Sequence, residues 1–296
     1  MKASFEDIVA LAETEGLSFA EAVLEQESRI TDVPVARIKE GMVSRLDEIK
    51  RSAREALECH CEGKITNADA PLLETYGKSG EPFSGRLTLR AAEIALAVAS
   101  SNACMGRIVA APTAGSCGII PGVLLASGEC RGYDGQTLLE GLITAGGIGQ
   151  VIASRATLAG AEGGCQAECG AATAMAAGAL VAMEGHGAET VAHASALALK
   201  SILGLVCDPV AGLVEVPCIK RNGVLTGLSS VCADMAAAGV KSVIPPDEVV
   251  DALSKVGKAL PETLRETGLG GLAATPAGKR LAENLRKTAP KLDESF

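Results

Sequence analysis

The segment that most constrains this chain is residues 206–222, with the sequence VCDPVAGLVEVPCIKRN. Pro209 and Pro217 each fix their own φ, lack an N–H group, and bias the preceding residue toward an extended conformation. The pattern therefore predicts a defined loop between helices over the whole segment. Cys207 and Cys218 lie near its two ends, beside acidic and basic side chains. A rigid loop with a thiol near each end suits a metal or cluster site.

The remaining cysteines leave two interpretations open. The segment GGCQAEC at 163–169 offers two further thiols, Cys165 and Cys169, with the close spacing typical of zinc ligands. Free cysteine also behaves as a small hydrophobic residue and is often simply buried. Cys59 and Cys61 flank a histidine at the end of a predicted helix, where adjacent side chains point in different directions, so we expect no metal there. From spacing alone, a thiolate site of undetermined metal and cysteines that fill a core both remain possible.

The composition predicts how this chain packs. Hydrophobic residues make up 48% of it, but aromatic residues only 2%, and there are 34 glycines. A core of such small side chains requires close helix–helix contacts. Apolar residues recur at helical spacing, and no strand-like alternation appears. We expect an all-α fold, a bundle of Ala/Gly-rich buried helices with cluster-binding loops. The predicted organisation is an N-terminal helical region (1–63), a turn-rich connection (64–86) and a helical catalytic core (87–296), with buried helices at 136–160, 170–184 and 188–203.

Charge and cysteine usage narrow the classes of partner and the compartment. The net charge of −9 argues against nucleic acid or an anionic membrane as a partner. No basic segment followed by an apolar run opens the chain, so we expect no secretory signal. The longest charge-free apolar run, around 171–183, is too short to span a bilayer. Ten cysteines in such a chain indicate a reducing cytoplasm, with thiols rather than disulfides.

A second motif, APTAGSCG at 111–118, predicts a turn followed by an apolar helix from Ile119. Thr113, Ser116 and free N–H groups are expected near the start of that helix, which favours a carboxylate or phosphate ligand. The alternative is an ordinary helix cap. No GK[ST] follows, so the motif is not a P-loop. Asn102, at the polar end of the preceding helix, is expected to face the same site.

Four segments together resemble the α subunit of the iron–sulfur-dependent L-serine dehydratases. They are APTAGSCGIIPG at 111–122, GCQAECG at 164–170, LGLVCDPVAGLVEVPCIKRN at 203–222 and RETGLGGLAATPAG at 265–278. The resemblance covers essentially the whole chain, and the third segment is long and specific. It implies a lyase that converts L-serine to pyruvate and ammonia.

The resemblance also implies how the reaction proceeds. Removing water from L-serine requires a base for the weakly acidic α-proton and a Lewis acid for the hydroxide leaving group. The family implies a [4Fe–4S] cluster held by Cys165, Cys207 and Cys218, with one iron left open to the substrate. Elimination gives aminoacrylate, which becomes an imine and hydrolyses to the products. The resemblance also favours carboxylate binding over helix capping for the 111–118 motif.

The site residues follow from these motifs. We expect the substrate to be bound by Asn102, Thr113, Ala114, Gly115 and Ser116, and catalysis to involve Thr113, Ser116 and Lys220. The candidates for tuning the cluster are Asp208, Glu168, Lys220 and Arg221. His186 and His193 lie in apolar surroundings and are predicted to be structural. The catalytic base is not identified by the sequence.

The resemblance extends to partners, and other functions are weighed beside it. Single-chain relatives carry an N-terminal β-type domain, so here we expect a separate β subunit, and an oligomer. The chain ends in Phe296, so no terminal cysteine is expected on the open iron. One alternative is a pyridoxal-phosphate dehydratase, although no Ser-x-Lys context stands out. Others are a related cluster-dependent lyase for L-threonine or L-cysteine, and a non-catalytic helical scaffold with a zinc or empty thiol site.

Overall fold

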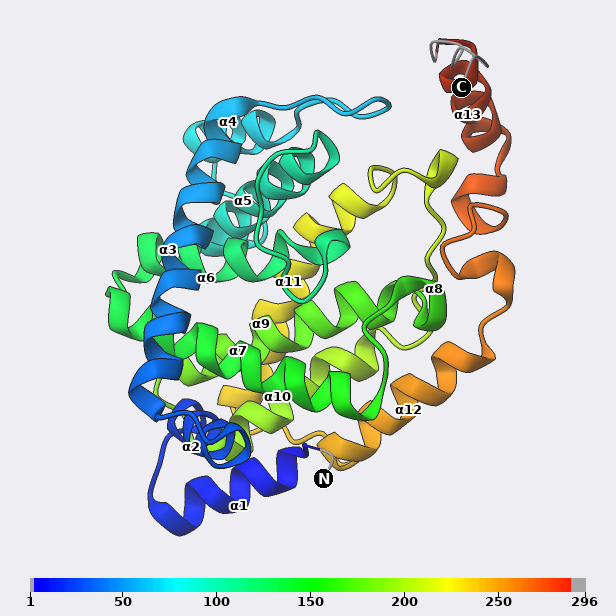
Figure 1. The fold of residues 1–296 in the computed structure, drawn as a ribbon. Helices are drawn as coiled ribbons and strands as arrows, with labels where there is room; N and C mark the ends of the chain where they lie inside the picture. Colours follow the sequence, from blue (N-terminus) through cyan, green and yellow to red (C-terminus); the bar gives the residue numbers. More distant parts are fainter. Residues whose placement is uncertain (1–2, 289–296) are drawn as a thin grey trace.

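The computed structural model describes residues 3–288, and over this range the regular structure is helical, with no β-strand (Figure 1). The all-α prediction is confirmed. Phe296 lies outside the described residues. The helices are α1 (Phe5–Glu15), α2 (Phe19–Thr31), α3 (Val35–Cys59), α4 (Ala70–Ser79), α5 (Gly85–Ala103), α6 (Ile119–Arg131), α7 (Gly135–Arg155), α8 (Gly160–Gly163), α9 (Ala171–Met183), α10 (Ala188–Ser201), α11 (Cys218–Ala237), α12 (Pro246–Ala259) and α13 (Pro276–Thr288).

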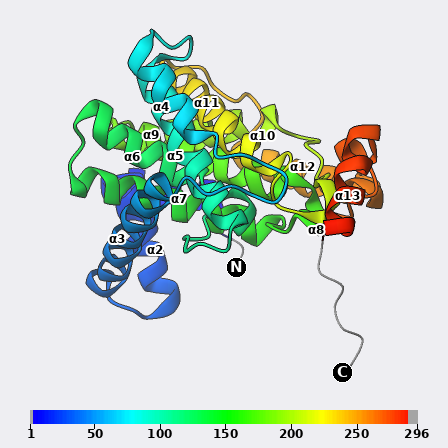
Figure 2. The ribbon, with the colours of Figure 1, turned by 90° about the horizontal axis from the view of Figure 1, so that it is seen from above.

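The core is built around α9, where all but one of the residues are buried. It packs against α6, α7, α10 and α11, while α5 lies between α6 and α11. A helix that is apolar on every side belongs in the middle of a protein core, which explains this central place. In both ribbon views, α2 and α3 lie on one side of the molecule and α12 and α13 on the opposite side (Figures 1 and 2). Buried side chains of α1 and α2 belong to the same hydrophobic core as those of α9.

Helix α7 is long and apolar enough to cross a bilayer, by length and composition alone. However, 67% of its apolar window is buried inside the protein. Its buried residues include Ile143, Ile148 and Ile152, which pack in the core with α9. We therefore interpret α7 as a core helix.

Three local predictions need correction or extension. The connection 64–86 is not made of turns alone, because α4 lies within it. Residues 218–222 are helical, since α11 begins at Cys218. Pro217 directly precedes that helix, where a missing N–H group costs nothing, so proline there starts a helix rather than preventing one. Finally, Cys59 and Cys61 form a disulfide, so the expectation of thiols throughout is wrong at this pair.

Glycine lets α5 and α6 approach closely. A Cβ atom added to Gly122 would lie 2.4 Å from the backbone oxygen of Ala91. We predict that Gly122→Ala lowers the free energy of unfolding by about 1–3 kcal/mol, because a backbone atom has to move. Gly146 is the matched control, since it is exposed within α7 and its Cβ would approach nothing closer than 3.8 Å.

Gly146→Ala should instead raise the unfolding free energy by about 0.5–1 kcal/mol, because alanine restricts the unfolded chain. Urea unfolding of both variants measures the two free energies. Equal destabilisation by the two substitutions would contradict the close-packing explanation.

Candidate active site

Three cysteine thiols line one cavity of about 170 Å³. Cys165 lies two residues after α8, Cys207 lies in the loop after α10, and Cys218 is the first residue of α11. All three are buried. The structure thus brings together the three residues expected to bind the cluster. The full lining is Ala114, Gly115, Cys165, Glu168, Cys207, Pro209, Gly212, Val214, Cys218 and Glu266.

The turn that presents Cys165 is fastened by a buried glutamine. Gly164 has φ +75°, a left-handed conformation that glycine adopts at little cost. Gln166 donates its backbone N–H to the Leu205 oxygen at 3.0 Å. Its side-chain oxygen accepts from the Gly204 N–H at 2.9 Å, and its side-chain nitrogen donates to the Leu253 oxygen at 3.2 Å. This fully buried amide therefore links the turn bearing Cys165 to the loop that leads to Cys207.

Cys207 is held by the C-terminal part of the chain. Its N–H donates to the Leu264 oxygen at 2.9 Å, and its carbonyl oxygen accepts from the Glu266 N–H at 2.8 Å. These two bonds form an isolated parallel β-bridge between Cys207 and Arg265. The pairing brings the Glu266 side chain to the cavity. The motif at 265–278 therefore forms a wall of the site, a role that the sequence did not predict.

A buried ion pair fixes the loop between the two cysteines. Arg221 donates to Asp208 Oδ1 and to the Val206 oxygen, each at 2.9 Å. The second carboxylate oxygen of Asp208 accepts from the Leu272 N–H at 2.7 Å. Breaking such a buried pair leaves an unpaired charge, so both residues hold their positions strongly. Asp208 and Arg221, both predicted as tuning residues, lie beside the thiols and tie three segments together.

The thiols of the cavity differ in acidity. Hydrogen bonding from Cys169, and then the nearby Arg221 cation, lower the pKa of Cys165 against the effect of burial. Burial first, and then the negative charge of Cys165, raise the pKa of Cys218 to about 12 and the pKa of Cys207 further still. Metal ligation requires thiolates, so binding here releases protons.

The three thiols reach the cavity from three separate segments of the chain. Among residues 3–288, no group of three or more His, Cys, Asp or Glu side chains could hold one metal ion. In a cluster each thiolate binds a different iron, so the ligands surround a cavity rather than meet at a point. The three thiols line a cavity, as cluster ligands would.

The loop at 111–118 forms another wall. Thr113 does not cap a helix, because its hydroxyl donates to Glu168 Oε1 at 2.9 Å. Asn102 donates to the Ala114 oxygen at 3.1 Å. Ser116 is fully buried and its hydroxyl lies 3.1 Å from that of Thr113. The capping alternative is therefore wrong for Thr113.

A buried asparagine positions this loop against α11. Asn222 Oδ1 accepts from the Gly118 N–H at 2.9 Å, and Asn222 Nδ2 donates to the Gly115 oxygen at 2.8 Å. Gly115 in turn lines the cavity. Asn222 closes the motif at 203–222, but nothing in the sequence showed that its amide would contact a loop more than a hundred residues away. The free N–H expected at the start of α6 is thus already bonded to protein.

Two carboxylates converge on the cavity. A Cβ atom on Gly160 would lie 2.6 Å from Glu168 Oε2 and 3.2 Å from Glu266 Oε2. The pKa of Glu168 is raised, mainly by burial and further by the nearby Glu266 charge. The hydrogen bond from the Thr113 hydroxyl opposes this shift in part. A half-buried carboxylate with a raised pKa, at the edge of a cavity, is typical of proton-transfer groups.

Lys220 and the histidines lie elsewhere. The Lys220 side chain is 49% exposed and pairs with Asp69, and it does not line the thiol cavity. The His193 ring accepts from the Ser242 N–H at 3.3 Å. His186 lines a separate hollow beside α9. The structure therefore does not bring Lys220 to the other predicted site residues.

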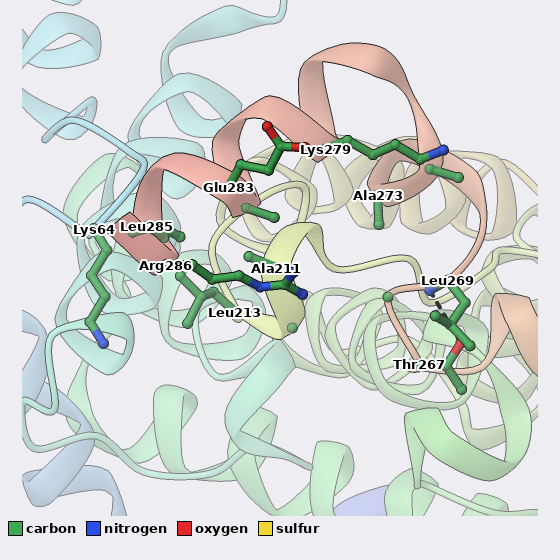
Figure 3. Close-up of a pocket in the computed structure, with 14 residues that line it drawn as sticks. Lys64, Ala211, Leu213, Thr267, Leu269, Ala273, Lys279, Glu283, Leu285 and Arg286 are labelled. Atoms are coloured by element: carbon green, nitrogen blue, oxygen red, sulfur yellow. Dashed lines mark hydrogen bonds between the residues drawn. The ribbon is translucent and has the colours of Figure 1, made fainter. Parts of the chain in front are cut away.

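A larger groove, of about 930 Å³, opens beside the thiol cavity and shares Gly212 with it (Figure 3). Its walls are α13 and the loop around Ala211 and Leu213, with Arg286 reaching across that loop (Figure 3). No cysteine lines it. The smaller cavity, with its thiols and carboxylates, is the candidate active site.

Comparison with known proteins gives one family. The model for the serine dehydratase alpha chain matches residues 14–273. A probable L-serine dehydratase alpha chain from Bacillus subtilis is 43% identical over 280 residues, covering 94% of this chain and 93% of the relative. The L-serine dehydratase alpha chain of Peptoniphilus asaccharolyticus is 43% identical over 285 residues, covering 95% and 97%. An L-serine dehydratase of Streptomyces coelicolor is 35% identical over 279 residues, covering 90% of this chain and 60% of the relative.

Proposed function

Because this chain belongs to the serine dehydratase alpha chain family, we propose that it is the α subunit of an L-serine dehydratase, a lyase that releases pyruvate and ammonia from L-serine. The observation that carries the proposal is the convergence of three thiols and two carboxylates on one small cavity. All four segments that carry the family resemblance contribute to its walls. Nothing in the site favours L-threonine or L-cysteine as the substrate.

We further propose that Cys165, Cys207 and Cys218 hold an iron–sulfur cluster. Such a group, when bound, supplies the Lewis acid that a hydroxide leaving group requires. The fit rests on the donor set: three buried thiols from three segments, arranged around a cavity. Asp208 and Arg221 stabilise the loop that separates two of these thiols. Orientation of ligands by surrounding hydrogen bonds is a general requirement of metal sites.

Proton removal and substrate binding are assigned to other residues around the cavity. We propose that the Glu168 carboxylate is the base that removes the α-proton. It lines the cavity and is oriented by the Thr113 hydroxyl. Ala114 and Gly115 leave room for the substrate beside it, because a Cβ atom on Gly115 would lie 3.1 Å from Glu168 Oε1. Ser116 is fully buried, and the Asn102 amide is bonded to Ala114. These two residues therefore support the loop rather than touch the substrate.

The assembly is also part of the proposal. The names of the matching proteins specify an alpha chain, which implies a second subunit. We propose that a separate β subunit completes the active enzyme, and that the enzyme acts in the cytoplasm. Formation of a larger oligomer stays a prediction.

The experiment is an anaerobic preparation of the chain, assayed for iron, sulfide and serine-dependent pyruvate formation. We expect iron and sulfide in comparable amounts, and pyruvate formation when the β subunit is present. Omitting the β subunit is the matched control for assembly. A preparation with bound zinc, no sulfide and no pyruvate formation in either mixture would contradict both the cluster and the activity.

Oxygen should inactivate this enzyme. A four-iron cluster held by three protein thiolates would have one iron without a protein ligand, so air is expected to destroy activity and visible absorption together. Incubation with ferrous iron, sulfide and a reductant should restore both. The measurement is activity against time in aerated and anaerobic buffer. Full activity after prolonged aeration would point to another cofactor.

A further inference from the structure

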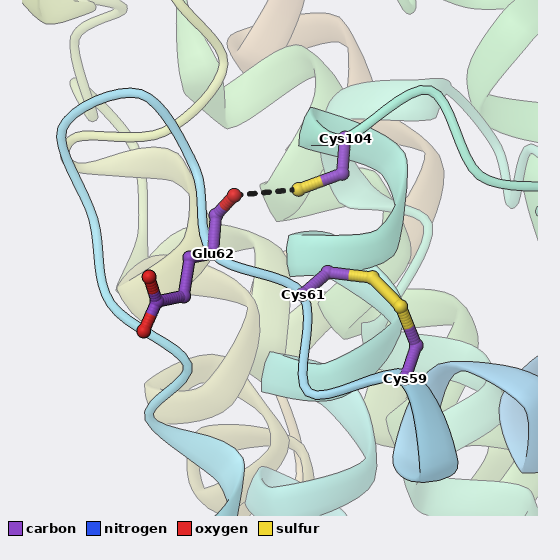
Figure 4. Close-up of a disulfide and its surroundings, with 4 residues drawn as sticks. All are labelled: Cys59, Cys61, Glu62 and Cys104. Atoms are coloured by element: carbon purple, nitrogen blue, oxygen red, sulfur yellow. Dashed lines mark hydrogen bonds between the residues drawn. A yellow bond between two sulfur atoms is a disulfide. The ribbon is translucent and has the colours of Figure 1, made fainter.

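A disulfide lies at the junction of α3 and the connection that follows it. Cys59, the last residue of α3, is bonded to Cys61, and their Cα atoms are 5.2 Å apart (Figure 4). His60 between them has φ +47°, a left-handed conformation that turns the chain sharply enough for the two side chains to meet. Cys59 is exposed and Cys61 half-buried, so small molecules in solution reach this bond.

A third sulfur contacts the residue that directly follows the disulfide. Cys104, just after α5, donates from its thiol to the Glu62 oxygen at 3.0 Å (Figure 4). Glu62 directly follows Cys61 in the sequence. The hydrogen bond therefore holds the Cys104 sulfur against the residue next to the disulfide. Burial first, and then the charge of Glu215, raise the pKa of Cys104. Cys104 therefore has to give up this proton before it can act as the attacking thiolate.

The segment after the disulfide is fastened to the loop of the thiol cavity. The Glu215 carboxylate is 2% exposed and accepts from the Lys64 N–H at 3.0 Å, the Ile65 N–H at 2.9 Å and the Thr66 hydroxyl at 3.0 Å. Its backbone oxygen accepts from the Ile219 N–H at 3.0 Å, in the first turn of α11. The disulfide, residues 62–66, Glu215 and the turn bearing Cys218 thus form one connected series of contacts.

From these contacts we propose that Cys59, Cys61 and Cys104 form a thiol–disulfide exchange site for low-molecular-weight thiols and disulfides, with its state transmitted through residues 62–66 and Glu215 to the cavity loop. Three sulfurs, their exposure and the Glu215 contacts carry this inference, which does not depend on the proposed activity.

Both exchange steps balance. Within the chain, the Cys104 thiolate attacks the Cys61 sulfur, the bond to Cys59 breaks, and Cys59 takes up the proton that Cys104 lost. The number of disulfides is unchanged. With an external dithiol, two electrons and two protons pass to Cys59 and Cys61, and the dithiol becomes a disulfide. Thiol–disulfide exchange of this kind proceeds through attack by a thiolate.

The first test is redox titration of the full-length protein in mixtures of oxidised and reduced dithiothreitol, followed by alkylation and peptide mass spectrometry. The ratio of bridged to reduced 59–61 peptide should change about tenfold for each tenfold change in the dithiothreitol ratio. Cys130→Ser is the control, since Cys130 is exposed at the end of α6 and should leave the ratio unchanged. A 59–61 segment that stays as two thiols in every mixture would overturn the proposal.

Two matched variants test the role of Cys104. With Cys59→Ser, oxidised dithiothreitol should link Cys61 to Cys104, because Cys61 adjoins Glu62, whose carbonyl oxygen accepts from the Cys104 thiol. With Cys61→Ser, no link to Cys104 should form, because Cys59 lies beyond the turn at His60. Absence of the Cys61–Cys104 peptide in the first variant would remove Cys104 from the site.

Amide hydrogen exchange tests the transmission. Reducing the disulfide should speed exchange at Lys64 and Ile65 by roughly tenfold, as loss of bonds to a buried carboxylate predicts, and should speed exchange across residues 210–216 as well. In Glu215→Gln these amides should already exchange faster, and reduction should add little, while circular dichroism confirms a helical fold. Unchanged exchange at residues 62–66 after reduction would show that the disulfide is not coupled to the cavity loop.

Discussion

Replacing Cys165, Cys207 or Cys218 with serine is expected to remove the iron and sulfide of the anaerobic enzyme and to lower serine dehydratase activity more than about 100-fold. Loss of a residue that only hydrogen-bonds to a metal ligand lowers metal affinity or activity by up to about 100-fold. Loss of a ligand itself is expected to have a larger effect. Each of the three thiols comes from a different segment of the chain. Iron, sulfide and pyruvate are measured on each variant.

Cys130→Ser and Cys232→Ser are the controls for this series. Cys130 is exposed at the end of α6, and Cys232 is buried in the later part of α11. Neither lines the thiol cavity. Both variants should keep normal iron and sulfide content. A complete cluster in Cys207→Ser would refute the assignment of the three ligands.

Glu168→Gln is expected to lower kcat by about 10²–10⁴-fold, the range for loss of a positioned general base. Glutamine fills the same space and still accepts a hydrogen bond from Thr113, so iron content and thermal stability should stay close to those of the parent. Glu189→Gln is the control, because Glu189 is exposed and pairs with Lys241 at the surface. Unchanged kinetics of Glu168→Gln would show that another group removes the α-proton.

Thr113→Ala should give a smaller effect in the same direction. It removes one hydrogen bond to a charged group, worth about 1.5–3 kcal/mol, so kcat/KM should fall by roughly one to two orders of magnitude. Because Thr113 caps no helix, the melting temperature should change little. A lowered melting temperature with normal kinetics would remove the 111–118 loop from the site.

The helical architecture was predictable because it depends on local pattern. Small apolar residues without alternation predicted buried helices, and α7, α9 and α10 lie within a few residues of the predicted ranges. The errors came from segments whose secondary structure depends on their surroundings in the fold. Pro217 was taken as a helix breaker, but it lies just before the first turn of α11, where proline is tolerated. The turn signals of 64–86 hid the short helix α4.

The site was predictable only where motifs carried it. The three cysteines, Glu168, Asp208 and the 111–118 loop came from motifs that resemble one family. Gln166, Asn222 and Glu266 were not assigned roles, because their contacts join segments far apart in the chain. Lys220 was grouped with the site by its neighbours in sequence, but on α11 it points to Asp69 while Arg221 points to Asp208. Successive residues of a helix face different directions, which separates these two cations.

The bridge between Cys207 and the segment around Arg265 has a consequence for biogenesis. Cys165, Cys207 and Cys218 are all translated before residues 264–272, which hold Cys207 and Asp208 in place and bring Glu266 to the cavity. A nascent chain therefore presents its three thiols before their surroundings exist. If the three thiols hold the proposed cluster, its insertion follows the synthesis of residues 264–272, so an assembly factor would recognise the folded site rather than the emerging polypeptide.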